Sequence, residues 1–146
     1  MAYQNVEKEI ERLKKYGRFS ETDSYIQHGS YSVYDHCVRV AKLSIRIQRF
    51  FHISVNEKYL IRGALLHDYF LYDWHISKKG HSRHGIMHPK IAWANTSQDY
   101  DLTYIEKDII LHHMFPLTLI PPKCKEAWIV CIADKICATQ EILTYI

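Results

Sequence analysis

An apolar run that ends in a histidine and an aspartate constrains the fold of this chain more than any other feature. Residues 59–66 read YLIRGALL, and His67 and Asp68 follow directly. At about 3.6 residues per helical turn, His67 continues the stripe of Leu60 and Ala64, and Asp68 also projects inward. Burying an unpaired carboxylate costs several kcal/mol. The pattern therefore predicts a positive partner for Asp68, which is either an arginine or lysine side chain or a metal ion.

Length and composition predict one globular domain. The chain has 146 residues, of which 47% are hydrophobic and 24% are charged, so it can bury a core. We expect an N-terminal helix and loop over residues 1–29 and the core over residues 30–140. The net charge of +3 does not demand a nucleic-acid partner, and no apolar run is long enough to span a bilayer. We expect a cytoplasmic protein with reduced cysteines and without a membrane partner, and a homodimer is compatible with the sequence.

Two further segments place a histidine at or near a helix start. Ser32 and Asp35 have the spacing of a capping box, which predicts the start of a long helix. His36 lies on the apolar face of that helix. Pro89 predicts another helix start, because proline is favoured at the first helical position. His88 would then lie at the cap of this helix, near its buried end.

The last two predicted helices also carry polar residues on apolar faces. Thr103 and Glu106 form a cap pair, and the helix that follows them ends near His112 and His113. The C-terminal helix, expected from about residue 123, carries a lone carboxylate, Asp134, in a stripe of small apolar residues. The sequence does not decide which of the two neighbouring histidines points inward.

These segments together predict a metal centre. Their polar residues follow the order H…HD…H…HH…D, and imidazole and carboxylate ligands without thiolate favour Fe, Mn, Ni or Zn. A single Zn²⁺ usually takes about four ligands, so this larger set suits two ions bridged by a carboxylate. The candidate ligands are His36, His67, Asp68, His88, His112, His113 and Asp134.

The His67-Asp68 doublet, with His36 upstream and Asp134 downstream, resembles the HD-domain metal-dependent phosphohydrolases over about residues 30–140. The resemblance implies an all-α fold, an HD-domain helical bundle with about five core helices around the metal site. It implies one ion held by His36, His67, Asp68 and Asp134. It implies a second ion held by Asp68 as the bridge, by His88, and by His112 or His113 or both.

The same resemblance implies hydrolysis of a nucleotide or another small phosphate ester through a metal-bridged hydroxide. Asp68 would be central to catalysis with two divalent ions, Fe or Mn first, and Ni, Zn or Mg as alternatives. Lys135 is a candidate for neutralising charge on the phosphoryl group. Lys78, Lys79 and Arg83 are candidate substrate-binding residues in a basic loop. These cations and the helix start predicted after the loop both favour an anion.

Two other functions remain open. Di-iron oxygenases of the HD-domain type have a similar order of ligands, and a regulatory module could bind metal or nucleotide without turnover. The HD-GYP cyclic-dinucleotide hydrolases share the double histidine, but Met114 follows it here where they commonly have Glu. Ser32 stands four residues before His36, where some of them have a Glu that supports a third metal. Cyclic di-GMP is therefore not the expected substrate.

Overall fold

The computed structural model describes residues 3–71 and 84–145, and the regular structure in this part is helical apart from one small hairpin. The elements are α1 (Gln4–Tyr16), the 3-10 helix η1 (Phe19–Ser24), β1 (Ile26–His28), β2 (Tyr31–Ser32), α2 (Val33–Phe50), α3 (Glu57–Leu66), α4 (His84–Asp99), α5 (Tyr104–His112) and α6 (Lys125–Tyr145). The two strands pair antiparallel. The predicted all-α fold is confirmed. No helix among the described residues combines the length and the apolar character needed to cross a membrane.

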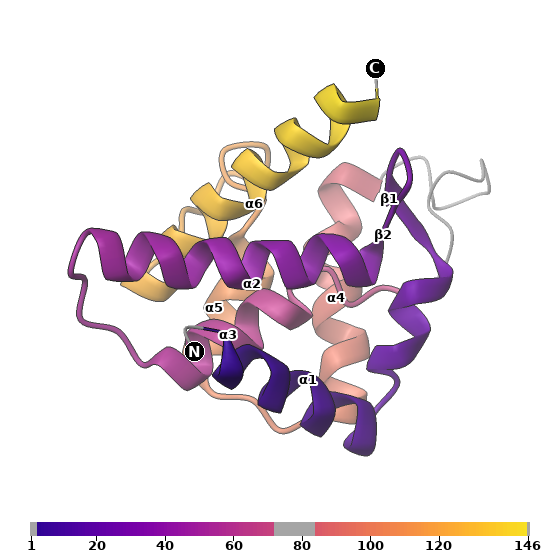
Figure 1. Ribbon diagram of the computed structural model, residues 1–146, viewed down its shortest axis with the longest axis horizontal. Coiled ribbons are helices and arrows are strands. Elements are labelled where there is room, and N and C mark those ends of the chain that lie inside the picture. The colour runs from indigo at the N-terminus through magenta and orange to yellow at the C-terminus, as the bar shows by residue number, and fades with distance from the viewer. Residues whose placement is uncertain (1–2, 72–83, 146) are drawn as a thin grey trace.

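The helices form a bundle around the long helix α2. Helix α2 crosses the middle of the molecule, with α6 along its upper side and α1 at the lower edge (Figure 1). Helix α2 packs on α3 and α6, and α5 packs on α3, α4 and α6. Five helices, α2 to α6, therefore surround one interior, in which the inward polar residues of the sequence lie.

Two helix starts follow the predicted capping chemistry, and a third does not. The backbone N–H of Asp35 donates to Ser32 Oγ at 3.0 Å, and Ser32 N–H donates to Asp35 Oδ2 at 3.1 Å. Thr103 and Glu106 form the second box. The predicted start at Pro89 was wrong, because α4 begins at residue 84 and holds Pro89 inside it. Proline favours the first helical position, but here the preceding residues extend the helix towards its N-terminus.

A glycine brings two of the ligand-bearing helices together. A Cβ atom at Gly63 would lie 2.3 Å from Cδ1 of Ile109, and 3.1 Å from its Cβ, so α3 and α5 cross here at a distance that only glycine permits. His67 and His113 each follow this crossing by four residues, which is about one helical turn. Their ring centroids are 4.7 Å apart. The close crossing therefore delivers both histidines to the same point.

The chain that leaves α3 is fixed directly after Asp68. The Tyr69 hydroxyl donates to Asp99 Oδ2 at 2.5 Å and accepts from the Arg18 N–H at 2.8 Å. The Arg18 guanidinium donates to the same carboxylate, with Nε at 2.9 Å. Asn95 Nδ2 donates to the Tyr69 carbonyl at 3.0 Å. These bonds tie the end of α3 to α4 and to η1, and so fix the position of Asp68.

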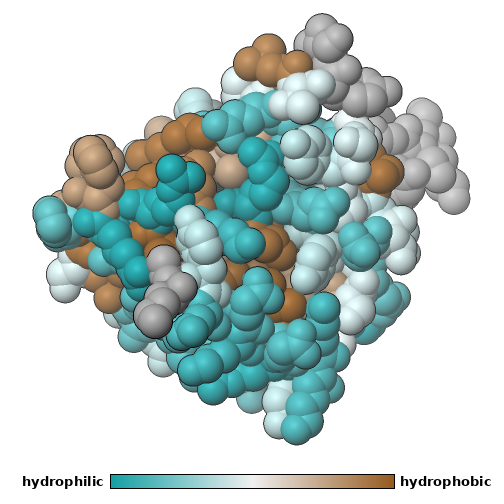
Figure 2. Space-filling model, in the orientation of Figure 1, coloured by the Kyte–Doolittle hydropathy of each residue, from teal (hydrophilic) through white to brown (hydrophobic). Residues whose placement is uncertain are grey.

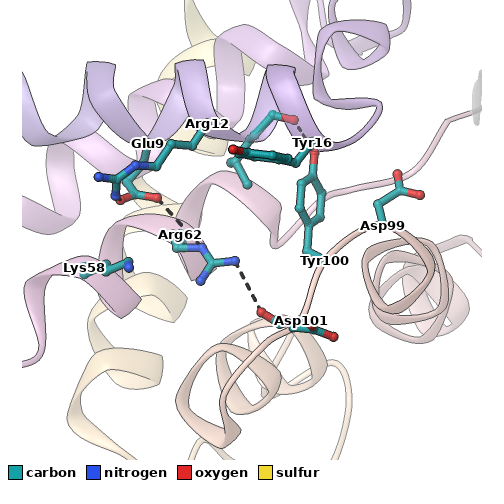
Figure 3. A pocket seen from close by; sticks show the side chains of 9 residues that line it. Glu9, Arg12, Tyr16, Lys58, Arg62, Asp99, Tyr100 and Asp101 are labelled. Atoms are coloured by element: carbon teal, nitrogen blue, oxygen red, sulfur yellow. Dashed lines mark hydrogen bonds and ion pairs between the residues drawn. The ribbon is translucent and has the colours of Figure 1, made fainter.

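A polar pocket lies between α1, α3 and the segment that joins α4 to α5 (Figure 3). Arg62 reaches Glu9 at 3.8 Å and donates to the carbonyl of Asp101 at 3.4 Å. The Tyr100 hydroxyl donates to the carbonyl of Leu13 at 2.6 Å. These contacts attach α1 to the bundle. None of the candidate metal ligands is among the described residues that line this pocket, so it is separate from the candidate centre.

Candidate metal centre

Four predicted ligands from three separate parts of the chain meet in the interior. His36 on α2, His67 and Asp68 after α3, and Asp134 on α6 offer ligand atoms that lie within 4.8 Å of one another. His36 Nε2 is 2.8 Å from Asp134 Oδ1, and His67 Nε2 is 3.2 Å from the same oxygen. Both Nε2 atoms are 3.3 Å from Asp68 Oδ2. All four side chains are buried. We call these four residues the first group.

A second group consists of Asp68, His88 and His113. His88 Nε2 hydrogen-bonds with Asp68 Oδ1, and His113 Nε2 lies 3.1 Å from this oxygen. The two Nε2 atoms of His88 and His113 are 3.3 Å apart. Asp68 therefore belongs to both groups. Its Oδ2 faces His36 and His67, and its Oδ1 faces the other two histidines.

Three of these histidines have their outer ring nitrogen bound to an acceptor. His67 Nδ1 lies 2.6 Å from the carbonyl oxygen of Ala64, and His113 Nδ1 lies 2.8 Å from the carbonyl oxygen of Ile110. His36 Nδ1 lies 2.9 Å from both carboxylate oxygens of Glu141. Each Nδ1 is thus the N–H donor, which leaves Nε2 as the inward nitrogen. Metal-binding histidines are held by outer acceptors in this way.

The donor set fits divalent metal ions. Each inward Nε2 faces a carboxylate oxygen, and two acceptors at such distances repel unless a proton or a cation lies between them. Ligands at about 2.1 Å from a metal are separated by roughly 3.0 Å when they are neighbours in an octahedron. The contacts of 2.8 to 3.3 Å between Nε2 and the carboxylates agree with that spacing. Imidazole and carboxylate ligands suit Fe, Mn, Ni and Zn.

The pKa shifts of these side chains show the same need for positive charge beside the carboxylates. Burial alone would lower the pKa of His36, but hydrogen bonds to Asp134, Asp68 and Glu141 outweigh it and hold the pKa well above 6.5. Burial also lowers the pKa of His67, and the nearby charge of Asp68 reverses the shift. Burial raises the pKa of Asp68, yet the charges of His67 and His88 hold it well below 3.8. The histidines around Asp68 and Asp134 thus favour the ionised form of both carboxylates.

The structure separates the two neighbouring histidines. His113 is buried in the second group, whereas His112 lies outside both groups. His112 Nδ1 is 2.5 Å from Asp108 Oδ1. The other oxygen of Asp108 accepts from the backbone N–H groups of Lys123 and Cys124 at 2.9 and 2.8 Å. His112 therefore belongs to a contact between α5 and the segment before α6.

Of the four predicted phosphate-binding cations, Lys135 is the one that the structure describes, and it is not a member of either group. The ammonium of Lys135 donates to the carbonyl of His113 at 3.1 Å and contacts Cys131 Sγ at 3.1 Å, so it is engaged with α5 and with its own helix. Lys78, Lys79 and Arg83 lie outside the described residues. The helix start that we expected at Pro89 is also displaced to residue 84, which removes one of the sequence arguments for an anion next to His88.

Residues that the sequence analysis did not identify surround the first group. Glu141 is fully buried, and besides His36 it accepts from Arg39 Nη1 at 2.7 Å and contacts His28 Nδ1 at 2.9 Å. Gln27 Nε2 donates to Asp68 Oδ2 at 2.8 Å. A signal for Glu141 exists, because it follows Asp134 by seven residues and so shares its helical face.

Comparison with known proteins gives one family assignment. The profile of the HD domain matches residues 33–139, which covers most of the chain. No match was found among curated proteins or among solved structures. The matched segment begins three residues before His36 and ends five residues after Asp134, so it contains every member of both groups. With its helical bundle and its His67-Asp68 doublet, the chain belongs to the HD-domain family.

Proposed function

We propose that this protein is a metal-dependent phosphohydrolase that acts on a nucleotide or another small phosphate ester with two divalent ions, Fe or Mn first. Membership of the HD-domain family supports the proposal, because metal-dependent phosphohydrolases make up much of that family. The observation that carries it is the position of Asp68, whose two oxygens face two different groups of buried ligands. A carboxylate shared in this way is typical of two-metal hydrolytic sites.

Some residues of the two groups would bind the ions, and neighbouring residues orient these ligands. When bound, two divalent ions supply Lewis-acid stabilisation of phosphoryl oxygens and lower the pKa of a bound water. Asp68 fixes the separation of the two groups, and Gln27 orients its Oδ2 by a hydrogen bond of 2.8 Å. Glu141 orients the His36 ring through Nδ1. The burial of all six ligands excludes bulk water, which strengthens every charge interaction in the centre.

We assign substrate recognition to the basic residues of segment 78–83 and not to Lys135. The ammonium of Lys135 already has oxygen and sulfur partners, so we give it a structural role. Lys78, Lys79 and Arg83 remain the proposed contacts to the phosphate group of the substrate. Replacing Lys78 and Lys79 together should raise KM for phosphate substrates and leave the metal content unchanged.

The test combines metal analysis with a phosphate-release assay. Protein purified without oxygen, and then loaded with Mn²⁺ or Fe²⁺, is assayed against nucleotides and simple phosphate esters. We expect two ions per chain and metal-dependent phosphate release. Asp68→Ala should lose both ions and the activity, because one carboxylate serves both groups. Asp101→Ala is the matched control, since this exposed carboxylate lies at the polar pocket and away from the centre.

Three outcomes would contradict the proposal. Product formation that requires oxygen, with no phosphate released anaerobically, would identify a di-iron oxygenase. Metal binding or nucleotide binding without turnover of any substrate would identify a regulatory module. Unchanged metal content in Asp68→Ala would show that Asp68 does not bridge the two groups.

A further inference from the structure

Helix α6 is apolar on two opposite sides. One side is buried in the bundle and carries Val130, Cys137 and the ligand Asp134. The opposite side is exposed and carries five large apolar side chains, which we call the α6 stripe. These are Trp128, Ile132, Ile136, Ile142 and Leu143, which expose 41, 49, 39, 47 and 66% of their surface. At about 100° per residue they fall within roughly a third of the helix circumference. A helix with an apolar face on two opposite sides normally has both faces covered.

The segment before α6 extends this apolar surface. Leu117, Leu119 and Ile120 are 58, 87 and 58% exposed. The segment is joined to the α6 stripe by Phe115, whose ring centroid is 5.7 Å from that of Trp128. Figure 2 shows apolar side chains along the upper left edge of the molecule, where Figure 1 places α6. We call the α6 stripe and these three residues together the apolar face.

The area of the apolar face matches what a stable dimer needs. At about 200 Å² for a fully exposed leucine or isoleucine, its eight side chains expose roughly 900 Å². The largest apolar patch on a typical monomer is about 300–600 Å². Each partner in an interface of standard size buries about 800 Å². The apolar face is thus larger than a monomer normally leaves in water.

The charges around the α6 stripe are compatible with packing against an identical stripe. Between residues 128 and 143, Lys135 is the only charged residue outside the buried side of the helix, because Asp134 and Glu141 point into the bundle. The Lys135 ammonium is bound to the carbonyl of His113 and to Cys131. The ammonium is thereby drawn towards α5 and Cys131, so two copies can meet along the α6 stripe with this lysine turned to the side of the contact.

We propose that the apolar face is the interface of a homodimer, in which α6 of one copy packs against α6 of a second across a two-fold axis. Such an interface is closed, because the same surface is buried on both copies. The α6 stripe spans 16 residues, or about 24 Å at 1.5 Å per residue, which gives several turns of helix-to-helix contact. The inference does not depend on the proposed activity, because the stripe lies on the opposite side of α6 from the metal ligands.

The test is the mass of the full chain in solution. Sedimentation equilibrium at micromolar concentration should give twice the chain mass of 17.4 kDa. Ile132→Glu/Ile136→Glu should be monomeric, with an unchanged far-UV circular dichroism spectrum. Ile132→Ala/Ile136→Ala, which introduces no charge, should raise the dimer dissociation constant roughly tenfold or more. Phe50→Glu is the matched control, because Phe50 is 76% exposed but lies at the end of α2, and it should remain dimeric.

The proposal fails if the wild-type chain is monomeric at all concentrations, or if it forms open-ended oligomers. It also fails if a dimer persists with unchanged affinity in the alanine variant, since the interface would then lie elsewhere. Loss of the dimer in Phe50→Glu would likewise place the interface at another surface.

Discussion

Replacing each of the two neighbouring histidines separately tests the metal centre. His113→Ala removes an Nε2 that lies 3.1 Å from Asp68 Oδ1, and so takes one of three protein ligands from the second group. Loss of an outer acceptor alone usually costs 10–100-fold in metal affinity, so we expect at least about 100-fold for the ligand itself. His112→Ala removes only the contact to Asp108. Bound metal should fall from two ions to one in His113→Ala and stay at two in His112→Ala.

Both replacements should also lower the thermal stability of the protein. A difference in bound metal between the two variants therefore cannot be attributed to destabilisation alone. His113→Ala leaves a cavity, since its side chain is fully buried. His112→Ala removes a partner of an ionised carboxylate, at a cost of about 1–2 kcal/mol, or roughly 2–8 °C in Tm. The assay is elemental analysis after dialysis against limiting chelator, with thermal unfolding measured in parallel. Equal metal loss in the two variants, or loss only in His112→Ala, would refute the assignment of His113 to the second group.

Three further predictions follow from single contacts. Glu141→Gln should lower metal affinity about 10–100-fold without changing the fold, because a neutral amide holds His36 less well, and metal titration by calorimetry measures this. Gly63→Ala should destabilise by about 1–2 kcal/mol in chemical denaturation, since overpacking against Ile109 exceeds the gain in helix propensity. Burial raises the pKa of Asp108, but hydrogen bonds from His112 and Cys124 hold it below 3.8. The ionised Asp108 carboxylate therefore stabilises the fold above pH 3.8, and this stabilisation is lost as the pH falls through the lowered pKa of the folded state. The Tm difference between wild type and Asp108→Asn should consequently shrink in acid.

Local chemistry in the sequence predicted the helices well, and predicted their mutual positions only in part. The Ser32 and Asp35 capping box is a contact between near neighbours, so its residues alone decide whether it forms. Periodicity placed Asp134 on a buried face for the same reason. Pro89 failed as a start signal because the preceding residues decide where α4 begins. The choice between His112 and His113 needed the crossing of two helices, which no local pattern encodes.

Of the two residues that orient the ligands, one could be predicted from the sequence and the other could not. Glu141 could have been found, since it continues the face of Asp134 by two helical turns. Gln27 could not, because it reaches Asp68 from a three-residue strand in a short hairpin, and 41 residues separate the two along the chain. Such contacts depend on how the whole chain packs.

The inward-facing histidines also determine what happens when metal enters. The carboxylates around His36 and His67 raise the pKa of both histidines, so they favour a proton on each imidazole beside Asp68 and Asp134. Such protons supply the positive charge that bound metal ions would supply. Metal uptake must therefore expel protons into the solvent. The apparent binding enthalpy should consequently vary with the ionisation enthalpy of the buffer, and mild acidification should release the metal while the helices stay folded.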